Sequence, residues 1–168
     1  MVDKDLCYGC HTCEVACKQE HNLPAGIGFI KVSQEGPRRI GRRLQTDYIP
    51  VICTHCEKPP CVPACPVHAI QQHPCGAVLI DSNICNSCRK CIEAFPFGAI
   101  QFYEEKNIAV KCDLCISRIN EGLLPACVHH CPTNALLFET PSTASLERGK
   151  SKMIFSYRLS KNVFSGYY

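Results

Sequence analysis

One cysteine spacing constrains what this chain can fold into more than any other feature. Cys7, Cys10, Cys13 and Cys17 follow the pattern Cys-x2-Cys-x2-Cys-x3-Cys. In this pattern three thiolates from one tight loop bind three irons of an iron–sulfur cube, and the fourth cysteine, one helical turn further on, binds a different cluster. The motif therefore predicts iron–sulfur clusters that are tied together in pairs.

Three further cysteine groups repeat this pattern with changes in spacing. They span residues 53–65, 85–95 and 112–131. Each is followed by a Pro-x-x-Ala segment that ends in Ile or Leu, beginning at Pro66, Pro96 and Pro132. This internal repeat indicates duplication of one ferredoxin unit made of a cluster loop, a short helix and a strand.

The composition favours metal centres over other uses of cysteine. The 168 residues contain 16 cysteines, which indicates either disulfides in an oxidising compartment or metal in a reducing one. No apolar segment typical of a signal peptide follows Met1, and no long apolar run is present, so we expect a cytoplasmic protein without a membrane span. The net charge of +3 argues against a nucleic-acid partner. A structural zinc or disulfide protein is the competing class, but zinc sites do not require the Cys-x2-Cys-x2-Cys-x3-Cys-Pro pattern.

Spacing alone leaves two pairings of the four groups open. Either the first pairs with the second and the third with the fourth, or the second pairs with the third and the first with the fourth. We expect an α+β fold of two pseudo-symmetric bacterial-ferredoxin-like modules, with short helices, small antiparallel sheets, inserted loops and a C-terminal extension. Metal replaces part of the apolar core, so the apoprotein should be largely unfolded.

Two segments carry no cluster motif. Residues 22–52 form an insertion with a strand expected near residues 29–32, followed by Arg38, Arg39, Arg42 and Arg43. This basic loop is either a solvated surface or a docking surface for an acidic partner or an anionic substrate. Residues 139–168 are polar and then aromatic, and we interpret them as a C-terminal docking extension and not as a disordered tail.

Two side chains close to the motifs need a separate interpretation. His55 lies between Cys53 and Cys56, and because three cysteines already surround it, we expect it to pack or hydrogen-bond near the cluster and not to bind metal. Cys75 lies outside every motif, in a turn at Cys75-Gly76 between two short strands. We interpret Cys75 as a free thiol at a hairpin tip.

Residues from about 4 to 138 resemble the four-cluster ferredoxin subunits of the dimethyl sulfoxide reductase group, which serve formate dehydrogenases and nitrate and polysulfide reductases. The resemblance rests on five segments: Cys7-x2-Cys10-x2-Cys13-Glu-Val-Ala-Cys17-Lys, Cys53-x-His55-Cys56-Glu-x-Pro-Pro-Cys61, Cys85-x2-Cys88-x-Lys-Cys91-Ile-Glu-Ala, Lys111-Cys112-Asp-Leu-Cys115 and Pro125-Ala-Cys127-x3-Cys131-Pro132-Thr.

The resemblance implies a nested set of ligands for three 4Fe-4S clusters. Cluster 1 would be bound by Cys7, Cys10, Cys13 and Cys131, cluster 2 by Cys112, Cys115, Cys127 and Cys17, and cluster 3 by Cys85, Cys88, Cys91 and Cys65. The implied modules are module A at residues 1–21 plus 107–138 and module B at residues 53–106.

The fourth site departs from the family pattern. Cys53, Cys56 and Cys61 should share a cluster with residue 95, which here is Phe95. A phenyl ring cannot bind iron, so three outcomes are open: a 3Fe-4S cluster, a cube completed by water or another side chain, or an empty site.

The motifs predict electron transfer and no catalysis by this chain. No nucleotide fingerprint or catalytic constellation accompanies the cysteines. The resemblance implies a catalytic partner with pterin-bound molybdenum or tungsten, such as a formate dehydrogenase, a tungsten aldehyde oxidoreductase or a tungsten-dependent benzoyl-CoA reductase, together with further electron-transfer subunits. The alternative is a free polyferredoxin that serves a hydrogenase or carbon monoxide dehydrogenase, although a soluble shuttle does not need the segments at 22–52 and 139–168.

Overall fold

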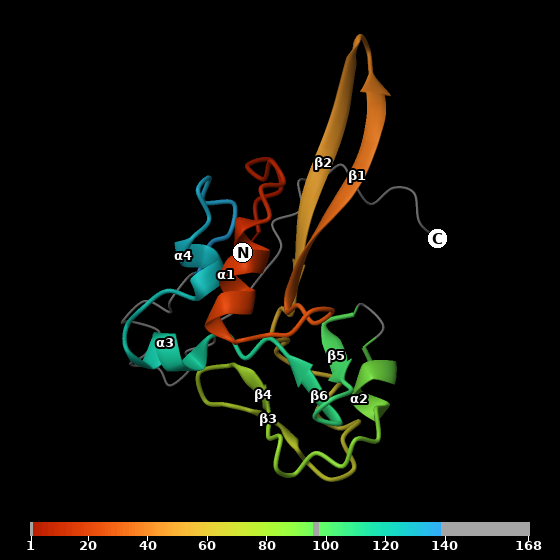
Figure 1. Cartoon of the computed structure of the whole chain (residues 1–168), viewed down its shortest axis with the longest axis vertical. Helices are drawn as coiled ribbons and strands as arrows, with labels where there is room; N and C mark the ends of the chain where they lie inside the picture. Colours follow the sequence, from red (N-terminus) through yellow and green to blue (C-terminus); the bar gives the residue numbers. More distant parts are fainter. Residues whose placement is uncertain (1, 96–97, 139–168) are drawn as a thin grey trace.

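The computed structural model describes residues 2–95 and 98–138, so the expected docking extension at 139–168 lies outside the described residues. Short helices and three two-stranded antiparallel sheets make up this part of the chain. It is a small mixed helix and strand fold, in which one long hairpin projects from a compact body (Figure 1). None of the helices in these residues is long and apolar enough to cross a membrane.

The helices are short and most of them begin directly after a cysteine loop. They are α1 (Thr12–Glu20), α2 (Lys90–Glu93), α3 (Ile116–Asn120) and α4 (Ala126–His129). The residue before α1, α2 and α3 has a left-handed backbone conformation, and no side chain caps any of these helices. Helices of this length are not stable alone in water. Their stability must therefore come from packing and from whatever the cysteine loops bind.

Two small hairpins form the other half of the body. Strand β3 (Ile70–Gln72) pairs with β4 (Val78–Ile80), and β5 (Ile100–Tyr103) pairs with β6 (Ile108–Lys111). The expected pair of short strands around Cys75-Gly76 is confirmed by β3 and β4. In Figure 1 these hairpins lie with α2 below α1 and α4.

The segment at 22–52 corrects the sequence interpretation. Instead of one short strand followed by a basic loop, it forms a long hairpin of β1 (Ile30–Ile40) and β2 (Arg43–Ile52), which we call the arm (Figure 1). The register shifts between Glu35 and Arg38, where Gly36 and Pro37 interrupt the pairing. The β-branched and aromatic residues of β2 favour a strand, and the basic residues lie at the outer end of the arm because they stay solvated there.

Cysteines form much of the interior. One buried cluster joins Cys13, Cys17, Cys53, Cys112 and Cys127 with apolar side chains from the base of the arm and from both ends of the described residues. The second joins Cys61, Cys65 and Cys91 with apolar residues of β3 to β6. The two ends meet through a β-bridge between Val2 and Leu136, which brings the first and last cysteine groups together.

Candidate metal centres

The four cysteine loops share one backbone feature. In each, the residue directly before the second cysteine has a positive φ: 76° at Gly9, 48° at His55, 64° at Ser87 and 64° at Leu114. This left-handed turn folds the loop back on itself, so that successive cysteines can face the same space. The sequence repeat is therefore also a repeat of local conformation.

The Pro-x-x-Ala segments repeat a second turn. The residue before each alanine has a positive φ, which is 53° at His68, 70° at Gly98 and 54° at Asn134. In the first copy this turn points the N–H of Ala69 at Sγ of Cys65, at 3.3 Å. A hydrogen bond of this kind stabilises a thiolate, so the segment that follows a cysteine also prepares it to bind metal.

Cage 1 is a small cavity at the N-terminal end of α1. It is lined by four of the cysteines, Cys7, Cys10, Cys13 and Cys131. Cys13 lies on α1, whereas Cys131 arrives from the far end of the described residues, just after α4. Helices α1 and α4 pack side by side (Figure 1), which explains how residues so distant in sequence reach one cavity.

Cage 2 is formed around the C-terminal half of α1 by Cys17, Cys112, Cys115 and Cys127. Burial raises the pKa of Cys17, and the neighbouring sulfurs of Cys112 and Cys115 raise it further. Burial likewise raises the pKa of Cys127, followed by the effects of Cys115 and Cys17. The electrostatic effects among these four thiols indicate that they lie near one another.

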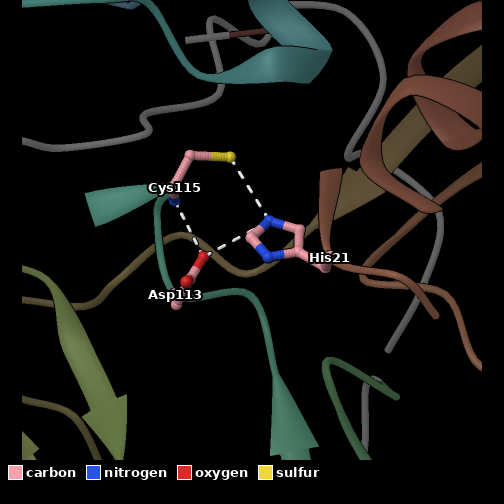
Figure 2. Close-up of side chains that lie close together, drawn as sticks. All are labelled: His21, Asp113 and Cys115. Atoms are coloured by element: carbon pink, nitrogen blue, oxygen red, sulfur yellow. Dashed lines mark hydrogen bonds and ion pairs between the residues drawn. The ribbon is translucent and has the colours of Figure 1, made fainter. Parts of the chain in front are cut away.

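A histidine that the sequence interpretation missed lies at the edge of cage 2. Figure 2 shows His21, from the end of α1, facing Asp113 and Cys115 from the loop after β6. His21 Nε2 is 3.4 Å from Cys115 Sγ and 3.5 Å from an Asp113 carboxylate oxygen. The spacing Cys17-x3-His21, one helical turn, was the signal that could have identified it.

Cage 3 is a small cavity in the other half of the body. Its lining includes four cysteines, Cys65, Cys85, Cys88 and Cys91. Cys65 and Cys91 are buried, whereas Cys88 is exposed at the surface. Arg89 also lines this cavity, and its guanidinium contacts both the ring of Phe102 and the carboxylate of Glu104, which places it at the rim.

Cage 4 is a small cavity that is lined by three cysteines, Cys53, Cys56 and Cys61, with Phe95 on its wall. Two buried polar side chains also line it, His55 and Lys111. The Lys111 ammonium donates to the carbonyls of Val78 and Cys112. Burial, together with the charge of Lys111, lowers the pKa of His55 to about 3, so the imidazole is neutral.

The donor chemistry of the cages fits iron–sulfur clusters. Among the described residues that line cages 1, 3 and 4 there is no carboxylate, and three or four cysteines face each cavity. Such a concentration of thiolate donors is typical of iron–sulfur and other soft metal sites. Burial raises the pKa of Cys13 to about 12 and that of Cys112 well above its usual value. A cationic iron core supplies the charge that converts such buried thiols into thiolates.

Cys75 is the cysteine outside the four sequence motifs, and it packs against the first buried cluster. It occupies the turn between β3 and β4, and its Sγ is 2.9 Å from Nδ1 of His73. None of the residues that line cages 1, 3 and 4 is Cys75. Its interpretation as a free thiol stays a prediction.

Comparison with known proteins adds an independent line of support. Residues 44–140 match the family model described as a 4Fe-4S dicluster domain. A tetrathionate reductase subunit of Salmonella typhimurium is 39% identical over 132 residues, which cover 78% of this protein and 53% of that one. A polypeptide of the anaerobic dimethyl sulfoxide reductase of Escherichia coli is 37% identical over 144 residues, with 82% and 70% covered. The thiosulfate reductase electron transfer subunit of Salmonella typhi is 34% identical over 148 residues, with 87% and 77% covered.

Proposed function

The protein belongs to the family with a 4Fe-4S dicluster domain, which includes iron–sulfur subunits of the dimethyl sulfoxide reductase type, and on this premise we propose that it relays electrons to or from a catalytic partner. Bound 4Fe-4S clusters accept and release single electrons. The observation that carries the proposal is the convergence of cysteines from distant parts of the sequence on shared cavities, above all Cys131 with Cys7, Cys10 and Cys13. Two of the relatives are named as an iron–sulfur subunit and an electron transfer subunit, which supports a role without catalysis.

We assign one 4Fe-4S cluster to each of cages 1, 2 and 3, with the cysteines of each cage as ligands, and a 3Fe-4S cluster to cage 4. The cavity linings support the assignment for cages 1 and 3, and the mutual effects of the four thiols support it for cage 2. Cage 4 keeps all three loop cysteines but has Phe95 at its wall, so three thiolates would hold three irons.

The four cages form a linear series. Cages 1 and 2 share α1, which carries Cys13 and Cys17, and they also share α4, which carries Cys127 and is followed by Cys131. Cages 3 and 4 are joined through Cys61 and Cys65, which belong to one buried cluster. The link between the two pairs runs from cage 2 to cage 4, because Cys112 and Cys53 belong to one buried cluster and interact electrostatically.

The ends of this series reach the surface. Cys10 of cage 1 and Cys88 of cage 3 are exposed, whereas the cysteines of cages 2 and 4 are buried or half-buried. Electrons would therefore enter at one end cage and leave at the other. An empty cage 4 would break the series in its middle, which is a further reason to assign a cluster to it.

The same connections suggest two modules and a separate docking element. Module A takes residues 1–21 and 107–138 with cages 1 and 2, and module B takes residues 53–106 with cages 3 and 4. The arm belongs to neither module and ends in Arg39, Arg42 and Arg43, with Ile40 and Leu44 exposed among them. We infer that the arm docks on an acidic face of the catalytic partner, and that residues 139–168 add to this contact.

The partner we propose carries a pterin-bound molybdenum or tungsten centre. A tungsten aldehyde oxidoreductase and a benzoyl-CoA reductase system are among the candidates. Further electron-transfer subunits would complete the complex. We place the complex in the cytoplasm because a reducing compartment keeps the cysteines available for iron. A free polyferredoxin is disfavoured by the arm, which a diffusing shuttle does not need.

Anaerobic purification of the untagged full chain from its own cells tests these points together. We expect a brown protein that bleaches with dithionite, contains about 15 irons per molecule and elutes with a larger catalytic subunit. Colourless protein would contradict the relay itself. A brown protein that elutes alone at monomer size would instead favour the free polyferredoxin.

A further inference from the structure

The wall of cage 4 contains an unusual polar atom. Nε2 of His55 is the buried side-chain nitrogen or oxygen that lacks a hydrogen-bond partner within residues 2–95 and 98–138. The residue is 2% exposed, and it lines the cavity together with Cys53, Cys56 and Cys61. A buried donor left unpaired costs about 1–3 kcal/mol. The group that occupies the cavity is therefore the natural partner of this atom.

The other ring nitrogen determines what Nε2 can do. The backbone N–H of Val78 donates to Nδ1 of His55 at 2.9 Å, so Nδ1 presents its lone pair and carries no proton. The ring proton is therefore on Nε2, which makes this atom a donor. Histidine binds metal through a ring lone pair, and in His55 that lone pair is already used. His55 is consequently not a substitute for the missing fourth cysteine.

The remaining groups around cage 4 do not supply a fourth ligand either. The ammonium of Lys111 has no lone pair and already donates to two carbonyls. Phe95 and the other non-cysteine side chains that line the cavity are apolar. Among the described residues that line cage 4, three thiolates face one hydrogen-bond donor and one buried positive charge.

We propose that Nε2 of His55 donates a hydrogen bond to a sulfur of the cluster in cage 4 and thereby raises its reduction potential. This inference rests on the proposed function, because it requires a cluster in that cage. A donor close to cluster sulfur stabilises the reduced state, which is the more negative one. Because cage 4 lies between cages 2 and 3 in the series, His55 sets the potential of an inner step of the relay.

Spectroscopy of the unmodified full chain, purified anaerobically, gives the first test. Electron–nuclear double resonance of the paramagnetic cage 4 cluster should detect an exchangeable proton that is lost in D2O, and a weak coupling to 15N-labelled histidine. A strong nitrogen coupling, typical of a direct iron–nitrogen bond, would overturn the proposal. The absence of any exchangeable proton near this cluster would overturn it as well.

Redox titration of variants gives the second test. His55→Leu should keep the iron content, lose the exchangeable-proton signal and shift the cage 4 cluster to a lower potential. Leucine suits this backbone because Leu114 occupies the same loop position, with φ 64°. His55→Gln keeps an N–H donor and should shift the potential back towards that of the unmodified protein, and His129→Leu, at an exposed histidine, should leave it unchanged.

Two outcomes of the titration separate this inference from the proposed function. If His55→Leu leaves the potential of the cage 4 cluster unchanged, His55 does not donate to it. If the unmodified protein holds iron in cages 1 to 3 but none in cage 4, the inference fails while clusters elsewhere remain. If His55→Leu does not fold, the spectroscopy of the unmodified protein still decides.

Discussion

Replacement of Gly9 by alanine tests how the arm supports cage 1. Gly9 has φ +76°, and a Cβ at this position would lie 2.4 Å from Cδ1 and 2.5 Å from Cε1 of the Tyr48 ring on β2. The corresponding residues of the other loops, His55, Ser87 and Leu114, are not glycines although their φ is also positive. The contact with Tyr48, more than the backbone conformation, therefore explains why this loop has a glycine.

The cost of Gly9→Ala can be divided into two parts. The left-handed conformation costs a residue with a Cβ about 1 kcal/mol, and an overpacked contact costs about 1–3 kcal/mol more. Gly26→Ala is a matched control, because Gly26 has φ +86° and nothing lies within 4 Å of its added Cβ. Gly26→Ala should therefore show only the backbone part.

The assay is the rate at which a chelator removes iron from the anaerobically purified full chain. When removal requires local opening of the loop, the extra 1–3 kcal/mol makes iron loss from cage 1 roughly 5–150-fold faster in Gly9→Ala than in Gly26→Ala. Tyr48→Ala in the Gly9→Ala background should relieve the steric part, as a double-mutant cycle would reveal. Equal rates of iron loss in the two glycine variants would refute the reasoning.

Three further predictions follow from the cages and the arm. Phe95→Cys should raise the iron content by about one per molecule and abolish the paramagnetism of the oxidised three-iron cluster, and an unchanged iron count would show that cage 4 holds no three-iron cluster. Arg39→Glu with Arg43→Glu should leave the iron content unchanged but release the catalytic partner at lower salt, because both side chains lie at the outer end of the arm; co-purification over a salt series measures this. Removal of all iron by a chelator should abolish most of the helical circular dichroism, since none of the described helices exceeds nine residues; a helical apoprotein would contradict the role of metal in the core.

The local structure could be predicted where the sequence repeats. Cysteine spacing indicated the loops and the short helix α1, and the turn at Cys75-Gly76 indicated the hairpin of β3 and β4, because each depends on neighbouring residues. Spacing could not decide which distant cysteine returns to which loop. That choice depends on the packing of α1 against α4 and on the bridge between Val2 and Leu136, which are contacts between residues far apart in the sequence.

The arm and the polar neighbours of the cages were harder to predict. The arginines and the Gly-Pro pair of the arm predicted a loop and not strands, because charged residues and proline are typical of loops. The contact between His21 and Cys115 could not be predicted from the sequence, because residue 21 approaches residue 115 only when α1 packs against the loop that follows β6. The role of His55 depended on one hydrogen bond from Val78, a residue of another element.

Cage 4 combines two features that act on its potential in the same direction. Lys111 adds a buried positive charge, and His55 offers a hydrogen-bond donor. Each makes an added electron easier to accept. In the proposed relay the inner cage next to cage 2 is therefore easier to reduce than a cage without a buried cation and a histidine donor. A three-iron cluster beside Phe95 would keep that relay continuous although residue 95 is not a cysteine.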